Sequence, residues 1–506
     1  MKPQLFNKLL LAVGMFMSVN IAAEAQLNLN KIANAAKNGA KQTTSNVTTT
    51  NRNPAVNNVK PTNTSALYVC KATGSNRNDG SKDAPFKNLQ KALDVAFDGQ
   101  TIYVAEGVYM GNLDNGTIEL KNKGVKIYGG YSSDFSKRDI SGTPTLIQPD
   151  LKCKGTRNAT NYAFGITADQ PVQSEVLIDG LIFNNGNHCT YLTDAMQERK
   201  GKRPAGIESN CLAPSPRPYS GVGGPNLDTP TQASDIYELR IYSNSNGHFN
   251  GGVTIQNCVF TNADCFAIQG QIKGNLLVQN NVFCNVAYSA CAVAGGFPPT
   301  QYGQKADGPR SRIEFAYNTV LFIWARDVTP DSDMGWGYRY MNGADHFVHN
   351  NIFGCTASGA LDRSFVEHNK ADQERQQATC DDNIFFCNRK ADLVLPSSGT
   401  LLPVWAKDLE DVETLTGKVA GNKTIDDASA FKGRIDDAYM KAYLNANYSE
   451  STNYNPNSAA NVLRSAFGMN QTGTMTIKVN FFGNRYPLAK VYDLFGAMEG
   501  YGAQNL

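Results

Sequence analysis

The sequence predicts an all-β chain wound into a right-handed parallel β-helix, and three observations lead to this prediction. Short segments with alternating apolar residues return along the chain, as in Ile255–Phe260 and Val278–Phe283. Asparagines recur at the same place in these segments, and a helical segment precedes the repeats. Each coil of such a fold adds one strand spacing, about 4.8 Å, so that the coils stack into a rod.

The N-terminus has the pattern of a secretory signal peptide over residues 1–25. Lys2 and Lys8 precede an apolar run from Leu9 to Ala23, and Ala23-Glu24-Ala25 provides small residues for cleavage before Gln26. The run is shorter than the roughly 18 residues of a membrane-spanning helix. We therefore expect a secreted protein, extracellular or periplasmic, with no membrane span.

Residues 26–65 are polar and contain few large apolar side chains, which predicts a disordered tether. Order is expected to begin with a strand at Tyr68. A helix is predicted next, because Leu89, Ala92, Leu93 and Ala96 have helical spacing and Asp98-Gly99 ends the pattern.

The repeats that follow have unequal lengths. Segments beginning at residues 255, 278, 315 and 348 are separated by 278 − 255 = 23, 315 − 278 = 37 and 348 − 315 = 33 residues, so one minimal coil precedes coils with insertions. Asn281, Asn318 and Asn351 fall at equivalent positions and are predicted to form a hydrogen-bonded ladder. A β-sandwich of hairpins is the alternative, although hairpin turn signals are scarce between the segments.

Four short motifs at the start of the predicted fold carry a family resemblance: Gly74-Ser75, Asn78-Asp79-Gly80, Ala84-Pro85-Phe86 and Gly107-Val108-Tyr109. They resemble the opening and capping helix of pectate-lyase-like right-handed β-helix proteins. The closing stretch from Phe482 to Glu499 is similar to the end of β-helix proteins secreted by Bacteroidetes. The resemblance covers most of residues 68–500 for fold, and it implies a role with extracellular polysaccharide.

The repeats assign the β-helix to residues 66–390. Beyond them the pattern fades, and residues 391–475 are predicted to form an insertion or cap with some helix, such as Asp436–Leu444; a separate small domain is the alternative. Residues 476–506 are predicted to supply C-terminal strands that close the helix.

Charge and cysteine content exclude some classes of protein. Lys and Arg total 47 and Asp and Glu total 45, so no basic field indicates nucleic-acid binding. The 11 cysteines are odd in number and irregularly spaced, which favours small apolar core fillers over a disulfide framework. We expect a monomer.

The candidate site lies on one sheet face of the rod. Strands Cys265–Gly270 and Ala290–Ala294 would share this face, and insertions at 191–250, 296–311 and 323–345 would border it. The side chains expected to point outward are mostly small, and such a floor can accept a flat, extended ligand: Ala267, Gln269, Ala290, Ala292 and Ala294.

Three groups of residues are predicted to act there. Substrate would contact Gln269 and aromatic faces that can pack on sugar rings, with Tyr340 as a further aromatic: Tyr302, Trp324, Trp336 and Tyr338. The catalytic candidates are cations that could hold or deprotonate an acidic sugar: Lys305, Arg310, Arg326 and Arg339. Three carboxylates could bind Ca²⁺: Asp327, Asp331 and Asp333.

These residues favour a protein that acts on an acidic polysaccharide. In related polysaccharide lyases, Lys or Arg removes a proton beside a carboxylate that a cation neutralises, so β-elimination is favoured over hydrolysis. Hydrolysis would need paired carboxylates, for which Asp264 and Asp345 are candidates. No compact active-site motif is present, and a non-catalytic glycan-binding or surface-adhesion protein is therefore the alternative, with a purely structural surface protein as a third.

Overall fold

A computed structural model describes one part of the chain in atomic detail. The chain divides into two units, Met1–Val59 and Lys60–Leu506. The predicted signal peptide and tether at 1–25 and 26–65 lie outside the described residues. All described residues lie in the second unit, at 66–111, 117–148, 162–184, 237–263, 265–296, 309–324, 335–363, 374–388, 391–397, 400–412, 415–425, 431–447, 459–471 and 485–506.

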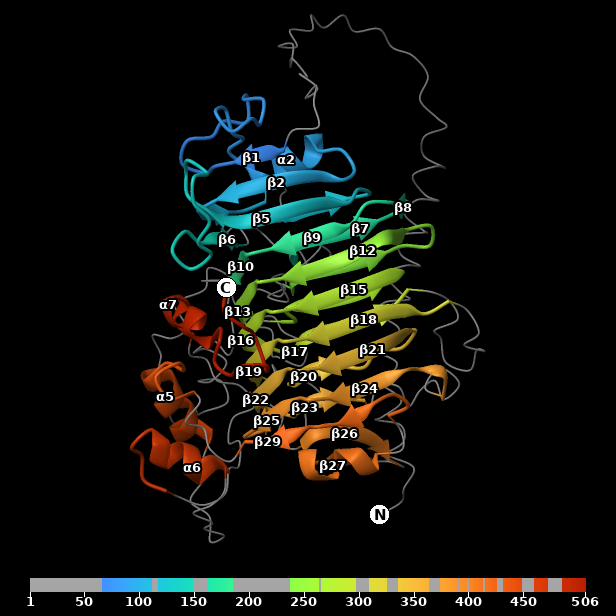
Figure 1. Ribbon diagram of the computed structural model, residues 1–506, viewed down its shortest axis with the longest axis vertical. Coiled ribbons are helices and arrows are strands. Elements are labelled where there is room, and N and C mark those ends of the chain that lie inside the picture. The colour runs from blue at the N-terminus through green and yellow to red at the C-terminus, as the bar shows by residue number, and fades with distance from the viewer. Residues whose placement is uncertain are drawn as a thin grey trace, which may run out of the picture. The chain divides into compact units, whose positions relative to one another are not determined.

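Three long sheets form a parallel β-helix, which confirms the predicted fold class (Figure 1). Successive strands pass from sheet A to sheet B to sheet C, and each strand pairs in parallel with its equivalent in the next coil. A sandwich of hairpins would give antiparallel pairs, whereas β26 and β27 form the one antiparallel pair among the strands described.

Sheet A contains, in spatial order, β1 (Leu67–Val69), β2 (Gln100–Ala105), β5 (Val125–Tyr131), β9 (Val176–Asp179), β12 (His248–Gln256), β15 (Gly274–Gln279), β18 (Ser311–Ala316), β21 (Ala344–His349), β24 (Ala378–Asp381) and β28 (Val419–Ala420), with β8 (Pro171–Val172) paired to β12. Sheet B contains β3 (Gly107–Tyr109), β6 (Thr145–Ile147), β10 (Leu181–Asn184), β13 (Val259–Ala263), β16 (Val282–Ala287), β19 (Thr319–Trp324), β22 (Ile352–Thr356), β25 (Ile384–Phe386) and β29 (Lys423–Thr424). Sheet C contains β4 (Ile118–Lys121), β7 (Tyr162–Ala168), β11 (Tyr237–Ser243), β14 (Ile268–Ile272), β17 (Ser289–Gly295), β20 (Trp336–Arg339), β23 (Gly359–Asp362), β26 (Ala391–Ser397) and β27 (Thr400–Val404).

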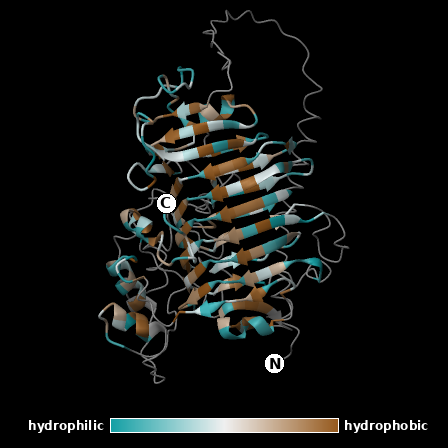
Figure 2. Cartoon of the chain, in the orientation of Figure 1, coloured by the Kyte–Doolittle hydropathy of each residue, from teal (hydrophilic) through white to brown (hydrophobic). Residues whose placement is uncertain are grey.

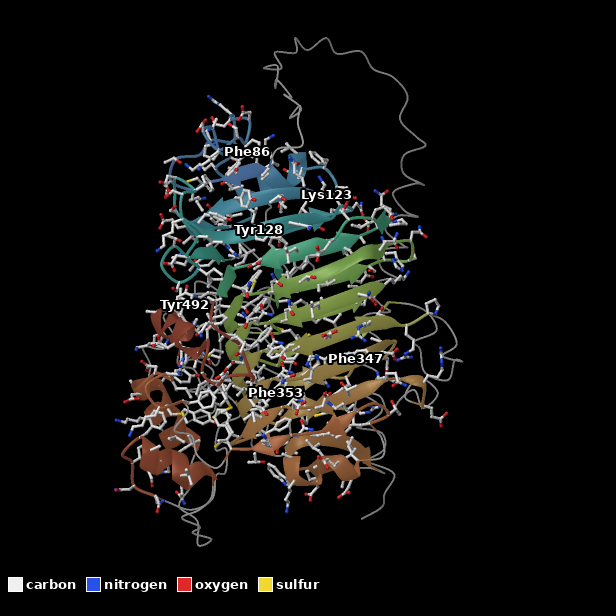
Figure 3. The ribbon with its side chains drawn as sticks, in the orientation of Figure 1. Phe86, Lys123, Tyr128, Phe347, Phe353 and Tyr492 are labelled. Atoms are coloured by element: carbon white, nitrogen blue, oxygen red, sulfur yellow. The ribbon has the colours of Figure 1, made fainter. Side chains whose placement is uncertain are left out.

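The core is built from inward side chains that stack on their equivalents in neighbouring coils. The rings of Phe183 and Phe260 are stacked with centroids 4.6 Å apart, and those of Phe260 and Phe283 are 4.8 Å apart. Phe353, labelled in Figure 3, stacks on Phe385 in the next coil. Apolar and polar residues alternate along the sheet A strands (Figure 2), which places one set inside and the other outside.

The predicted asparagine ladder is present at the bend between sheets A and B. The Asn281 amide nitrogen donates to the Asn318 side-chain oxygen at 3.0 Å, and Asn318 donates to Asn351 at 3.2 Å. The ladder continues to Asn383 and Asn422, which the sequence analysis did not name. These buried bonds fix the register of each coil on the next.

Helices and 3₁₀ turns close both ends of the core. At the N-terminal end α2 (Leu89–Val95) buries Leu89, Ala92 and Leu93, as predicted. At the other end η4 (Ala406–Asp411) buries Ala406 and Leu409.

The predicted boundary of the β-helix at residue 390 is wrong. Strand β26 pairs with β23, β28 with β24 and β29 with β25, so the coils continue to Thr424. The last coil has very short strands, and for this reason its repeat is weak in the sequence. Helix is confirmed in 391–475, with α5 (Asp437–Asn447) and α6 (Ala459–Ala466).

The expected closing strands at 476–506 are also wrong where the structure describes this stretch. Residues 485–506, which we call the C-terminal clasp, form α7 (Leu488–Val491) and η6 (Tyr492–Leu494). The clasp lies beside sheet B and its bend with sheet A (Figure 1). The backbone N–H groups of Gly502, Ala503 and Gln504 donate to three successive coils, at Asn350 O, Thr319 Oγ1 and Asn280 Oδ1.

Helix α5 covers the neighbouring part of sheet B. Phe322 makes edge-on contacts with Tyr439 and Tyr443, at centroid distances of 4.9 and 5.1 Å. The Tyr439 hydroxyl also donates to the Asn285 side-chain oxygen at 2.9 Å. Sheet B is therefore packed against the C-terminal part of the chain.

The cysteines of the described residues are buried, in agreement with the prediction of core fillers. Burial raises the pKa of the Cys258 thiol to about 12, so it stays neutral. No helix among the described residues has the length and apolarity needed to cross a bilayer.

Candidate functional site

The outer face of sheet C carries two rows of side chains in register across neighbouring coils. In the first row Arg240 lies between Gly165 and Gln269. In the second row Tyr242 lies between Thr167 and Gln271. We call Arg240, Gln269, Thr167, Tyr242 and Gln271 the sheet C polar face; all five are partly exposed.

The strand pattern explains why these side chains point outward. Leu239 and Ile241 flank Arg240 and are fully buried in the core, as are Ile268 and Ile272 on the next strand. Because side chains alternate across a strand, Arg240, Gln269 and Gln271 point away from the core.

Arg240 is the charged residue among the five that make up the sheet C polar face. Its guanidinium carbon lies 4.9 Å from the ring centroid of Tyr242 and 5.5 Å from that of Tyr162. Among the described residues it has no carboxylate partner and no hydrogen-bond acceptor, so that part of the chain leaves its N–H donors unused. A partly exposed guanidinium without an acidic partner can bind an anionic group.

The neighbouring polar groups differ in how firmly they are held. The Gln271 amide donates to the Ser243 carbonyl at 3.1 Å, whereas the Gln269 amide makes no hydrogen bond to a described residue. At the edge of the face, Lys121 and Asp169 pair at 2.6 Å. Gln269, a predicted substrate-binding residue, is thus placed on the predicted face beside Arg240.

The small residues that were predicted to line the ligand-binding face are mostly buried. Ala267 and Ala290 have no exposed area and Ala292 is 4% exposed, while Ala294 is partly exposed. The expectation that all four line an open surface is therefore corrected.

A second correction concerns the aromatic side chains that were predicted to contact substrate, because those that the structure describes are buried. Trp324 is 0% exposed, and Trp336 and Tyr338 are each 1% exposed. Trp324 donates from its indole nitrogen to Asn285 and faces Tyr443 of α5. A ring buried in protein cannot stack on a sugar.

Tyr338 and Tyr340 belong to a buried polar cluster instead. The Tyr338 hydroxyl lies 2.6 Å from the Nδ1 of His346, and the His346 Nε2 lies 2.8 Å from the Met341 carbonyl. Burial lowers the pKa of His346 to about 3, so the imidazole is neutral. The Tyr340 hydroxyl donates to the Thr379 carbonyl at 2.8 Å.

The described catalytic candidates are held in ion pairs. Arg339 is 4% exposed, and its Nε lies 2.7 Å from an oxygen of Asp362, which is fully buried. Arg310 pairs with Asp345 at 2.7 Å and donates to the Ala344 carbonyl at 2.6 Å. Both arginines therefore hold neighbouring coils together, and the prediction that they act on substrate is corrected.

The other predicted site residues lie outside the described residues: Lys305, Arg326, Tyr302, Asp327, Asp331 and Asp333. Within the part of the chain that is described, no group of three His, Cys, Asp or Glu side chains could hold a metal ion. The Ca²⁺ site therefore stays a prediction.

Arg240, Tyr162 and Tyr242 were not predicted as site residues. Residues 191–250 were treated as one insertion, although Tyr237–Ser243 alternates polar residues with Leu239 and Ile241. That short alternation was the available signal.

Fold and face together define a parallel β-helix protein with a polar outer sheet face, on which Arg240 has no acidic partner among the residues that the structure describes. A family described as "Protein of unknown function (DUF1565)" matches residues 72–297, which include the sheet C polar face. A solved structure of a rhamnogalacturonan lyase is 11% identical, with a TM-score of 0.25, over 87% of this chain and 99% of that chain. The fold is assigned from the three parallel sheets of the structure. The search of curated proteins found no match.

Proposed function

We propose that this protein binds an acidic polysaccharide along the sheet C polar face. The observation that carries the proposal is Arg240, a partly exposed guanidinium that no carboxylate of the described residues contacts. It lies beside Gln269, whose amide has no protein partner among the described residues. A cation next to a free amide matches the carboxylate and hydroxyl groups of an acidic sugar.

The arrangement of the face suits an extended polymer. Arg240 and Gln269 lie on adjacent coils, and so do Tyr242 and Gln271, with about 4.8 Å between strands. A polymer lying across the strands would meet one pair of polar groups after another. Binding through such repeated contacts does not need a deep cavity.

Cleavage by β-elimination is the second candidate function, and Arg240 is the observation that favours it. A guanidinium bound to the sugar carboxylate would stabilise the charge that develops when the neighbouring proton is removed. Arg310 and Arg339 are engaged in ion pairs. The described residues therefore support binding more strongly than cleavage.

The test is a titration of the full-length protein with polygalacturonate, alginate and neutral dextran, followed by calorimetry. We expect an acidic polymer to bind, and Arg240→Ala to weaken that binding about 10-fold or more, the loss of one charge-assisted contact. Arg312→Ala is the matched control, because Arg312 is an exposed arginine on sheet A.

The outcomes separate the two functions. Absence of binding by the wild-type protein to all three polymers would reject the proposal, as would equal binding by Arg240→Ala. Ultraviolet absorbance of unsaturated products, recorded in the same samples, would add the lyase activity if it rises with wild type and not with Arg240→Ala.

A further inference from the structure

We infer that Tyr162 and Tyr242 are positioning residues that hold the Arg240 guanidinium ready for a planar carboxylate. This inference rests on the proposed function and deepens it, because it explains how one arginine can select its ligand. The two rings lie on different coils, Tyr162 on β7 and Tyr242 on β11 with Arg240.

The two contacts restrain the long arginine side chain. The guanidinium carbon is 5.5 Å from the Tyr162 centroid and 4.9 Å from the Tyr242 centroid, both within the range of cation–π attraction. A free arginine side chain loses considerable rotamer entropy when it binds a ligand. The two ring contacts restrict the rotamers of Arg240 before a ligand binds, so binding loses less side-chain entropy.

Gly165 makes room for one of the rings. Gly165 is the residue in register with Arg240 on the preceding coil. A Cβ atom at this position would lie 2.4 Å from the Tyr162 Cε2 atom, so any side chain would push the ring away. The φ angle of Gly165 is not in the left-handed region, and space is thus the reason for glycine here.

Tyr162 is itself firmly placed. It is 6% exposed, and its carbonyl accepts a hydrogen bond from the buried Thr117 hydroxyl at 2.9 Å. Tyr242 is partly exposed, and its hydroxyl makes no hydrogen bond to a described residue. Tyr162 is therefore the more rigidly held of the two rings that contact Arg240, and Tyr242 acts through the contact of its ring.

The chemistry of this arrangement favours a carboxylate. The guanidinium contacts the two rings and donates to no acceptor in the described part of the chain. Two parallel N–H groups of a guanidinium match the two oxygens of a carboxylate. A lysine ammonium at the same place would keep the charge and lose the paired geometry. Arginine held in this way thus discriminates by shape as well as by charge.

The experiment measures the ratio of two dissociation constants, for carboxyl-reduced polygalacturonate and for polygalacturonate itself, with the full-length protein. We expect Tyr242→Leu to lower this ratio about 2–5-fold, the size of one partly exposed cation–π contact. Tyr242→Phe keeps the ring and should keep the ratio. Gly165→Ala, which displaces the Tyr162 ring, and Arg240→Lys should both lower it.

A purely structural role would change the melting temperature and leave the ratio alone. The inference is overturned if Tyr242→Leu melts like the wild type and retains the wild-type ratio, or if Tyr242→Phe loses the ratio as fully as Tyr242→Leu. If the wild type binds both polymers equally well, the inference fails while polysaccharide binding stands. If it binds no polysaccharide, the proposed function fails first.

Discussion

The coils of sheets B and C pair in parallel in the same way, but the outer faces of the two sheets have different surroundings. On sheet B, Phe322 and Trp324 contact the tyrosines of α5, and the Tyr486 backbone of the C-terminal clasp bonds to Asn262. On sheet C, Arg240 and Gln269 are partly exposed and lack hydrogen bonds to described residues.

This difference separates stability from recognition. A buried aromatic contributes through burial and packing, and it cannot also contact a ligand. A partly exposed polar residue contributes little to stability and is free to bind. We therefore expect substitutions on the two sheets to affect different measurements.

The largest expected effect is on the free energy of unfolding, from a substitution where α5 covers sheet B. Tyr443→Ala removes a fully buried ring that contacts Phe322 and Trp324, and it should lower the free energy of unfolding by about 3–5 kcal/mol. Urea denaturation followed by circular dichroism measures the change. A loss below about 1 kcal/mol would mean that α5 does not support sheet B.

The next effect is at the bend between sheets A and B. The Asn318 side chain accepts from Asn281 and donates to the Val278 carbonyl and to Asn351. Asn318→Ala leaves these buried groups without partners and should cost about 2–4 kcal/mol in the same assay. Asn250→Ala serves as the control, because the Asn250 side chain is exposed and its described hydrogen bond goes to exposed Gln173. Equal losses from the two variants would contradict the role of the ladder.

A third test uses pH and the buried end of sheet C. Burial raises the pKa of Asp392 to about 6, although Asn388 and the Ala406 N–H donate to its oxygens. A raised carboxyl pKa means that the folded protein keeps the proton to a higher pH than the unfolded chain. The stability from this group is therefore complete below about pH 4 and is lost as the pH rises through about 6, by about 2–3 kcal/mol.

Asp392→Asn removes this dependence, and unfolding free energies at pH 4 and pH 8 reveal it as a difference between variant and wild type. The difference must be taken because His346 acts in the opposite direction. Its lowered pKa of about 3 makes the folded protein lose stability as the pH falls below about 6.5. A constant gap between variant and wild type across this range would show that Asp392 does not titrate as stated.

The smallest expected effect is on the open part of sheet C. Gln269→Ala should change the free energy of unfolding by no more than about 0.5 kcal/mol, because the side chain is partly exposed and makes no hydrogen bond to a described residue. Thermal and urea unfolding would show it. A loss comparable to that of Tyr443→Ala would remove the distinction between the two sheets.

The sequence was sufficient for the fold because the fold depends on local, repeated chemistry. Inward residues must be apolar in every coil, and an asparagine buried at a bend needs an equivalent asparagine above and below it. Both requirements leave periodic signals, and the prediction of Asn281, Asn318 and Asn351 as a ladder followed from them. Ends without a repeat, such as β28 and the clasp, were assigned wrongly.

The site was less predictable because exposure depends on contacts that are distant in sequence. Trp324 is covered by Tyr443 of α5, and Arg339 is neutralised by Asp362 through the register of β20 on β23. No local pattern records either contact. Arg240 was not predicted because its short strand, β11, lies within a stretch that was interpreted as one long insertion.

The C-terminal clasp has a consequence for the order in which the protein is made. Gly502, Ala503 and Gln504 are synthesised after the coils, which run to Thr424, yet they donate to Asn350, Thr319 and Asn280 in the middle coils. Those coils can stack as they are synthesised, but their outer acceptors gain these partners only once the clasp has been made. A chain without residues 485–506 would form the coils but lack these hydrogen bonds, and we expect faster proteolysis at sheet B.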